Sequence, residues 1–405
     1  MRLRLLVLLL AAATSARAAI DPAAARSAFG ELRAMCDRDA GKLWGVRLCG
    51  PTLFVERSTR AVAADTASDA LKAADGVFLG TLPKEIGIAN TAVDWDGTHW
   101  TMVVWPLPED AYARRVILAH ESWHRIQEGL GFPFAGPSNP HLDTAGGRRL
   151  LQLEWRALAA ALRSKGSARK RALVDALHFR ELRRATFEGA AKDEQALEMH
   201  EGLAEYSGTA LAEPSLAARV PHVVKALHAA ESTPTFVRSF AYASGPAYGA
   251  LLDAVDAQWT RKLKPSDDFG ALIAHRYHVS ASKRIDANAY DAVALRAAEE
   301  KREAEQQARL RELQARFVDG PTLVLPLARM NMQFDPNEAQ SYPDHGTVYP
   351  KIHLTDEWGA IDVKRGGALI TSDWTKMIVP RPPNDDYTLT LADGWEVAEG
   401  TVRKR

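Results

Sequence analysis

The sequence predicts an α+β fold with a small β-sheet, then a mainly helical region, and then a β module at the C-terminal end. Three observations support this prediction. Residues 91–105 have the alternation and the central Asp96-Gly97 pair of a β-hairpin. Apolar residues recur at helical spacing through most of residues 109–288, and after Asp319-Gly320-Pro321 the pattern changes to short strands and turns.

The N-terminal α/β region is assigned to residues 19–108. We expect a helix at 23–38, strands within 43–57 around Gly50-Pro51, an alanine-rich helix at 59–74 and the hairpin at 91–105. The strand at 99–104 is expected to be the active-site edge strand, along which a bound peptide would lie.

The helical region is assigned to residues 109–288. Glu109 and Asp110 suit the positive N-terminal end of a helix that ends before Gly129, Gly131 and Pro133. Further helices are expected at 148–163, 169–187 and 193–212, and in 215–258 with breaks at Thr233-Pro234 and Gly245-Pro246. A long charged helix is assigned to 289–318 and the β module to 319–405.

Length and charge limit the classes of protein. A chain of 405 residues allows two or three domains. Lys+Arg and Asp+Glu both number 51, so the formal net charge is +0 and gives no basic excess for a nucleic acid or an anionic membrane. We therefore expect no nucleic-acid partner.

The first residues predict export. Arg2 and Arg4 precede an apolar stretch at 5–13, and Ala16-Arg17-Ala18 has the small-x-small pattern of a cleavage site. Residues 1–18 are therefore expected to be a signal peptide removed before Ala19, and an uncleaved anchor is the alternative. No later segment is apolar enough to cross a membrane, so we expect a periplasmic or extracellular protein without a transmembrane segment in the mature chain.

Two cysteines bear on both compartment and metal chemistry. In an oxidising compartment Cys36 and Cys49 can form a disulfide, and two buried free thiols are the alternative. Since two cysteines cannot make a cysteine-only zinc site, a metal would have to be held by histidine and carboxylate side chains.

The stretch His120-Glu121-Ser122-Trp123-His124 is typical of zinc hydrolases. Residues four apart share one helical face, so His120 and His124 can bind one zinc ion, and we expect one Zn²⁺ per chain. Glu121 is the expected general base, which takes a proton from the attacking water and later protonates the leaving amine. The alternative is a buried helix with two hydrogen-bonded histidines.

A catalytic zinc usually has a third protein ligand, and two glutamates are candidates. Glu201 lies in His200-Glu201-Gly202-Leu203-Ala204-Glu205-Tyr206, whereas Glu154 lies on an apolar helical stripe with Leu150, Leu151 and Leu158. A carboxylate on such a stripe needs a partner, which could be the zinc, Arg125 or a zinc histidine.

The two glutamates after the histidine motif carry a family resemblance. His120-Glu121-x-x-His124 followed by Glu201-Gly-Leu-Ala-Glu205 resembles the gluzincin metallopeptidases, over roughly residues 90–255. The resemblance implies a zincin-like catalytic domain, Glu201 as the third ligand and Glu205 as the acid that orients a zinc histidine. The separation from His124 to Glu201 is longer than in the best-known gluzincins, and the second acid is Glu rather than the Asp of some members.

Tyr242 is the expected transition-state donor. Tyr242-x-x-Gly245 before an apolar helix is similar to the stretch that supplies this tyrosine in several gluzincins, and a tyrosine packed in the core is the alternative. The Gly-x-Met-Glu-Asn stretch with which aminopeptidases of that superfamily hold a free N-terminus is missing, which favours endopeptidase or carboxyl-side activity.

The expected function is zinc-dependent hydrolysis of peptide bonds in a peptide or protein substrate. Two alternatives stay open. One is a zinc amidase for a non-peptide amide such as a cell-wall component. The other is a binding or structural protein with a degenerate metal site, in which the β module would carry the function.

Overall fold

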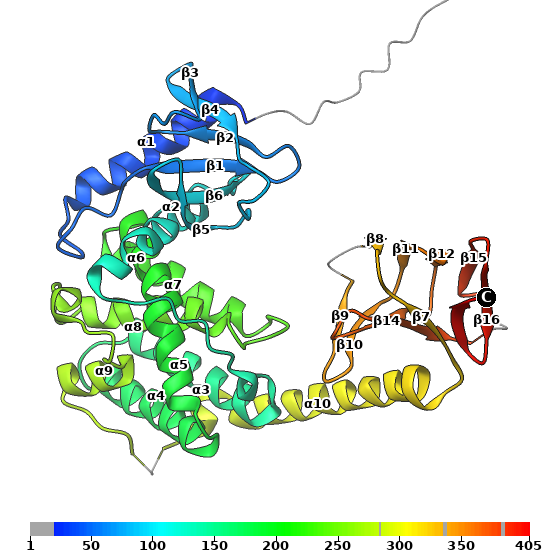
Figure 1. Ribbon diagram of the computed structural model, residues 1–405. Helices are drawn as coiled ribbons and strands as arrows, with labels where there is room; N and C mark the ends of the chain where they lie inside the picture. Colours follow the sequence, from blue (N-terminus) through cyan, green and yellow to red (C-terminus); the bar gives the residue numbers. More distant parts are fainter. Residues whose placement is uncertain (1–19, 283–284, 335–337, 382–384) are drawn as a thin grey trace, which may run out of the picture. The chain divides into compact units, whose positions relative to one another are not determined.

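The protein is an α+β structure whose described part divides into two compact units (Figure 1). The computed structural model describes residues 20–282, 285–334, 338–381 and 385–405. The first unit ends at Glu299 and the second begins at Glu300. The expected signal peptide lies outside the described residues.

A six-stranded sheet forms one part of the first unit, in the order β3-β4-β2-β1-β6-β5. Its strands are β1 (Thr52–Glu56), β2 (Ala61–Ala64), β3 (Lys72–Ala74), β4 (Val77–Thr81), β5 (Thr91–Trp95) and β6 (Thr98–Trp105). The β5–β6 hairpin confirms the prediction for 91–105. The two faces of the sheet alternate in the expected way, since Leu53 and Val55 pack in a different apolar cluster from Phe54.

Three predictions for this region are wrong. Only one strand, β1, lies within 43–57, because residues 40–46 form turns and bends before Gly50. Residues 59–74 contain β2 and β3 instead of a helix, because the alanines of β2 are buried in antiparallel pairing with β1 and β4, and such tertiary pairing overrides helix propensity. The strand at 99–104 is not an edge: β6 pairs with β1 on one side and β5 on the other. The edge strands of this sheet are β5 and β3.

Helix α1 (Pro22–Asp39) is the helix expected at 23–38. The side chain of Asp21 caps its start by accepting from the N–H groups of Ala23 and Ala24. A disulfide joins Cys36 near its end to Cys49, which precedes β1, so the expected bond is present. This bond ties the first helix to the sheet.

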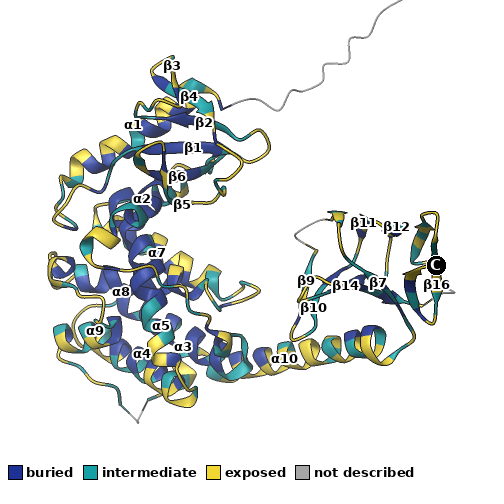
Figure 2. Ribbon diagram, in the orientation of Figure 1, coloured by how far each residue is buried: buried dark blue, intermediate teal, exposed yellow. Residues whose placement is uncertain are grey.

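Eight helices from α2 to α9 build the rest of the first unit among the residues described. They are α2 (Ala111–Ile126), α3 (Ala145–Arg163), α4 (Gly166–Thr186), α5 (Ala190–Leu197), α6 (Leu203–Ala212), α7 (Leu216–Ala230), α8 (Phe240–Asp253) and α9 (Phe269–Tyr277). Short 3-10 turns lie at 128–130, 140–143, 259–262 and 287–290, and a π-helical turn, Glu198–Gly202, joins α5 to α6. The inner faces of α2, α3 and α8 are buried in one large apolar cluster (Figure 2).

The break expected at Gly245-Pro246 is absent, because α8 continues through both residues. Proline in a helix loses one hydrogen bond, here the bond to the carbonyl of Tyr242. Almost every residue from Phe240 to Leu252 is buried, so packing holds the helical backbone in place.

Helix α10 (Ala292–Gln314) crosses the boundary between the units, and a π-helical turn, Ala315–Asp319, follows it. The second unit has two sheets, ordered β16-β17-β7-β14-β13-β10-β9 and β15-β12-β11-β8. Their strands are β7 (Thr322–Pro326), β8 (Asn331–Gln333), β9 (Gln340–Tyr342), β10 (Gly346–Tyr349), β11 (Ile352–Asp356), β12 (Gly359–Val363), β13 (Ala368–Thr371), β14 (Lys376–Pro380), β15 (Tyr387–Leu391), β16 (Trp395–Ala398) and β17 (Thr401–Lys404). Leu325 of one sheet and Leu354 of the other belong to the same core, so the two sheets pack together.

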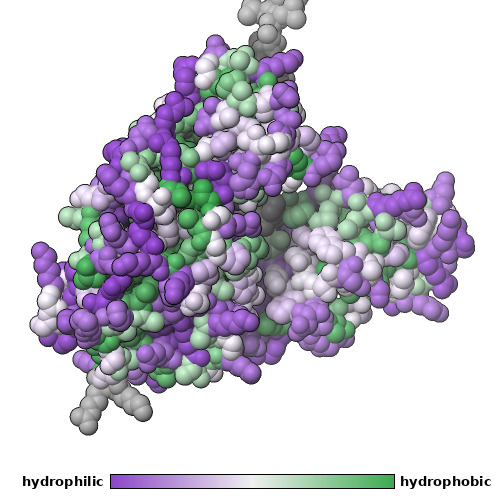
Figure 3. Space-filling model, turned by 60° about the vertical axis from the view of Figure 1, so that its left-hand side comes forward, coloured by the Kyte–Doolittle hydropathy of each residue, from purple (hydrophilic) through white to green (hydrophobic). Residues whose placement is uncertain are grey.

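The outer surface is mostly hydrophilic on the face drawn in Figure 3, with hydrophobic residues in scattered patches. Within the described ranges, no helix combines the length and apolar character needed to cross a membrane.

Candidate metal centre

Helix α2 presents both histidines of the motif to one cleft. Asp110 caps the helix through a 2.8 Å hydrogen bond from the N–H of Ala113. Trp123 anchors it on another face, with its ring 4.1 Å from that of Trp44. These contacts hold α2 in place. Since residues four apart lie on one helical face, His120 and His124 stand one turn apart and both face the cleft.

The π-helical turn and α6 supply the carboxylates. Glu201 lies in the π-helical turn and Glu205 in the first turn of α6. Single π-helical turns inside helices are frequent at functional sites. Two close approaches bring these elements together: a Cβ on Gly208 would lie 2.7 Å from the carbonyl oxygen of Val116 in α2, and one on Gly245 would lie 2.2 Å from that of Gly202. Any larger residue there would push α6 or α8 away from the site.

The three side chains His120, His124 and Glu201 form a buried group that could hold a metal ion, and among the described residues it is the group found with that character. The two Nε2 atoms are 3.1 Å apart, and each is 3.5 Å from Oε2 of Glu201. Ligand atoms placed tetrahedrally about 2.0 Å from an ion lie about 3.3 Å from one another. The three atoms therefore form one face of a tetrahedron of the right size.

The Nδ1 atoms of both histidines have partners that leave Nε2 directed at the centre. Oε2 of Glu205 lies 2.7 Å from Nδ1 of His120, and Oε1 of Gln127 lies 3.1 Å from Nδ1 of His124. An acceptor at Nδ1 keeps the proton there and frees the Nε2 lone pair for a metal.

Glu121 lines the same cleft but is not one of the three possible metal ligands. Its residue is 5% exposed, and its Oε2 is buried with no hydrogen-bond partner. Its Oε1 lies 3.9 Å from Nε2 of His120. The cleft has a volume of about 490 Å³ and is also lined by apolar residues of α2 and α7, including Val116, Ile117 and Val223. Since a buried carboxylate oxygen normally has a donor, Glu121 is poised for a group that enters the cleft.

Glu201 has two further neighbours from the segment before and at the start of α8. The hydroxyl of Tyr242 donates to Oε2 at 2.7 Å, and Nη2 of Arg238 donates to Oε1 at 3.1 Å. The ring of Tyr242 also stacks on that of His120, with 5.4 Å between the ring centroids. Tyr242 thus lies at the centre of the site and is 39% exposed, which excludes the alternative of a tyrosine buried in the core.

The charges of the site favour a cation. Burial would lower the pKa of His120, but hydrogen bonds with Glu201 and Glu205 outweigh burial and raise this pKa to about 10. Burial would raise the pKa of Glu201, but the neighbouring histidines hold it far below its usual range. Burial raises the pKa of Glu121 against the opposite effect of both histidines. Three carboxyl groups therefore surround the two imidazoles, and a proton on His120 occupies the position that a metal ion would take.

Glu154, the other candidate for third ligand, does not join this group. Arg183 donates to its Oε2 at 2.5 Å, while Tyr248 and Arg180 donate to its Oε1 at 2.6 and 3.3 Å. Its partners are thus two buried arginines and a tyrosine, in place of the zinc, Arg125 or a zinc histidine. This alternative is therefore not supported, because the apolar stripe on α3 shows only that the carboxylate is buried.

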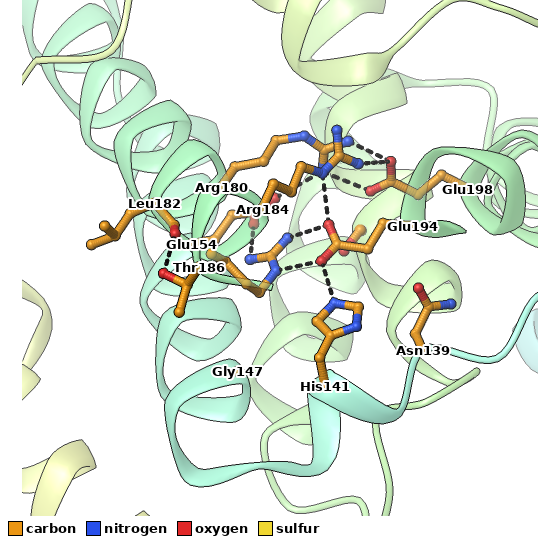
Figure 4. A network of polar contacts seen from close by, with 12 residues as sticks. Asn139, His141, Gly147, Glu154, Arg180, Leu182, Arg184, Thr186, Glu194 and Glu198 are labelled. Atoms are coloured by element: carbon orange, nitrogen blue, oxygen red, sulfur yellow. Dashed lines mark hydrogen bonds and ion pairs between the residues drawn. The ribbon is translucent and has the colours of Figure 1, made fainter. Parts of the chain in front are cut away.

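The arginines belong to a buried ion-pair network between α3, α4, α5 and the π-helical turn (Figure 4). Arg180 binds Glu198 through both terminal nitrogens, and Arg183 and Arg184 bind Glu194. His141 joins the network through a 2.8 Å contact with Glu194. The helix predicted at 169–187 was expected to be basic on one side, and Arg180, Arg183 and Arg184 share such a face; what the sequence did not show is that this face is buried against carboxylates.

Sequence reasoning also missed Gln127 and Arg238, which contact the site from outside the motifs. A scan against models of protein families, a search of curated proteins and a search of solved structures each returned no match. The conclusions about this site therefore depend on its own geometry.

Proposed function

We propose that the protein is a zinc-dependent peptidase with one zinc ion per chain, held by His120, His124 and Glu201. The observation that carries the proposal is the tetrahedral spacing of the three ligand atoms beside a buried, unpartnered Glu121. Two imidazoles and one carboxylate with a fourth position left open is a usual ligand set of catalytic zinc. The resemblance to gluzincins leads to the same assignment.

When bound, zinc supplies a Lewis acid that polarises a carbonyl and makes water acidic enough to react near neutral pH. Glu121 takes a proton from the attacking water while the water oxygen bonds to the carbonyl carbon. Glu121 then delivers that proton to the leaving nitrogen as the carbon–nitrogen bond breaks.

Tyr242 and Glu205 have supporting roles in this proposal. With a metal on Oε2 of Glu201, the hydroxyl of Tyr242 can turn to the oxygen that becomes negative in the transition state. Burial and the nearby Glu201 raise the pKa of Tyr242, so the hydroxyl keeps its proton and acts as a donor. Glu205 fixes the tautomer of His120.

The substrate class and location belong to the same proposal. We infer a peptide or protein substrate, and a protein exported to the periplasm or the outside of the cell by residues 1–18. The signal-peptide prediction can be checked by N-terminal sequencing of the secreted chain, which is expected to begin at Ala19.

The decisive experiment is Glu121→Gln. The variant is expected to keep about one zinc per chain and to lose peptidase activity by about 100- to 10,000-fold, because the amide cannot take up the proton. Hydrolysis of a peptide library is measured beside the metal content. Glu128→Gln is the matched control, since Glu128 follows α2 in the exposed 3-10 turn and is expected to leave the rate unchanged.

Each alternative gives a different result. Zinc-dependent release of ammonia or amine from cell-wall fragments, with no peptide cleaved, would assign the site to a non-peptide amidase. Zinc binding together with an equally low rate of peptide hydrolysis in wild type and Glu121→Gln would indicate a metal-binding protein that is not a peptidase.

A further inference from the structure

Arg238 is a cation beside the metal centre that the proposed reaction does not use. Its side chain is 49% exposed, and Nη2 lies 3.1 Å from Oε1 of Glu201. Among the described residues, Glu201 is the one polar partner found for this guanidinium. An arginine has five N–H donors in a planar fork, so most of the donors of Arg238 remain available to a ligand.

Arg238, Gly136 and Phe134 form a rim beside the metal centre, and Phe134 is its apolar side chain. A Cβ on Gly136 would lie 3.2 Å from Nη1 of Arg238 and 3.5 Å from the ring of Phe134. The absence of a side chain at Gly136 thus leaves Arg238 and Phe134 close together. Phe134 is 70% exposed, and its ring lies 4.8 Å from that of His200, which in turn lies 4.8 Å from that of His124. The rim therefore adjoins the metal ligands.

The backbone that carries Arg238 is held in place. Oδ1 of Asp143 accepts from the N–H of Phe236 at 2.8 Å, and Oδ2 accepts from the hydroxyl of Thr235 at 2.6 Å. The side chain of Asn139 reaches the carbonyl of Val237 at 3.4 Å. Because these bonds tie residues 235–237 to residues 139–143, the backbone that presents Arg238 needs little reordering when a ligand binds.

The distribution of charged groups around Arg238 also favours an anionic ligand. The carboxylates near the centre other than Glu201 are Glu121 and Glu205, which line the cleft with Glu201, whereas Arg238 touches the opposite oxygen of Glu201. A metal on Oε2 would take up much of the charge of Glu201 and leave the guanidinium with an attraction for a second carboxylate.

We infer that Arg238 binds the C-terminal carboxylate of a peptide, with Phe134 against the terminal side chain, so that the protein removes an apolar or aromatic residue from a free C-terminus. This inference rests on the proposed peptidase function. The carboxylate carbon of a terminal residue lies three bonds, or roughly 4 Å, from the scissile carbonyl carbon. An arginine that binds this carboxylate must therefore lie close to the metal ligands, as Arg238 does through its contact with Oε1 of Glu201.

The experiment separates binding from turnover. Zinc-loaded Glu121→Gln protein is titrated with a blocked tripeptide ending in Phe, as the free acid and as the amide. The free acid is expected to bind about 10- to 100-fold more tightly, as a charge-assisted bond to arginine requires. Adding Arg238→Gln should remove this preference and leave amide binding unchanged, and Arg238→Lys should restore part of it.

Two controls make the outcome specific to the carboxylate. Arg47→Gln removes an arginine that is also 49% exposed but pairs with Asp37, and it should keep the full preference. Zinc content is measured for each variant, with titrations at saturating zinc, so that metal loss is not mistaken for ligand loss. Equal binding of acid and amide, or an equal loss of both in Arg238→Gln, would overturn the role of Arg238.

The same peptides distinguish failure of the two proposals. If wild type hydrolyses acid and amide at equal rates, the peptidase function stands and the carboxylate site is overturned. If the free acid binds through Arg238 but wild type cleaves neither peptide, the carboxylate site stands and the peptidase function fails.

Discussion

Two buried glutamates of the first unit, Glu201 and Glu154, have similar surroundings but differ in whether they can bind a metal ion. Each accepts a hydrogen bond from a tyrosine of α8, at 2.7 Å from Tyr242 to Glu201 and at 2.6 Å from Tyr248 to Glu154. Each also has basic neighbours. Those at Oε2 of Glu201 are two histidines that face a cleft, with the half-exposed Arg238 at Oε1, whereas those of Glu154 are arginines buried within the core.

The difference lies in which basic side chain is the partner. Arginine stays protonated and donates in a fixed fork, so Glu154 is compensated permanently and its site is closed to other cations. Histidine can give up its proton and offer a lone pair, so the charge of Glu201 can be compensated either by a proton or by a metal ion. Burial of a carboxylate thus does not indicate a metal site unless its partners can become ligands.

The largest effect is expected from the same substitution at both glutamates. Glu201→Gln should reduce the metal content from about one ion per chain to nearly none, because a neutral amide is a poor ligand. Glu154→Gln should keep the metal and lower the free energy of unfolding by about 3–5 kcal/mol, since it leaves buried arginine charge uncompensated. Metal analysis and denaturant unfolding of the metal-free proteins measure the two effects.

The reverse pattern, with metal lost in Glu154→Gln and kept in Glu201→Gln, would show that the third ligand is misassigned. Glu128→Gln is the control in both assays, because its side chain is exposed.

The two tyrosines provide the next comparison. Tyr242→Phe should lower kcat by about 100- to 1,000-fold with the metal retained, as expected when one transition-state donor is removed. Tyr248→Phe should leave kcat unchanged and lower the free energy of unfolding by about 1–3 kcal/mol, because a buried carboxylate loses one of its donors. A similar loss of kcat in both variants would indicate that α8 acts through packing and not through the Tyr242 hydroxyl.

The sequence predicted those features that depend on neighbouring residues. The β5–β6 hairpin follows from alternation around Asp96-Gly97, and α2 with its two cleft-facing histidines follows from spacing and the cap at Asp110. Glu201 was one of two carboxylate candidates for the third ligand, and the family resemblance favoured it and added Glu205, since nothing local to them specifies a contact with α2.

Other features depend on contacts between distant parts of the chain. The alanines of β2 read as helical until β1 and β4 pair with them. The π-helical turn at 198–202 has no sequence signature, and the arginine partners of Glu154 come from α4, whose burial no local pattern specifies. Arg238 and Glu201 are 37 residues apart and come together in the region where α8 and the π-helical turn meet at Gly245 and Gly202.

The smallest effects concern the acceptors behind the two histidines, which differ in charge. Glu205→Gln should weaken zinc binding by about 10- to 100-fold, because a charged partner of His120 makes its Nε2 a stronger ligand. Gln127→Met should weaken it by only about 2- to 10-fold, because the bond to His124 is neutral and longer, at 3.1 Å against 2.7 Å. Competition with a zinc indicator of known affinity measures both. Equal losses in the two variants would mean that the charge of Glu205 contributes nothing to the metal centre, and that its role is limited to the orientation that Gln127 also provides.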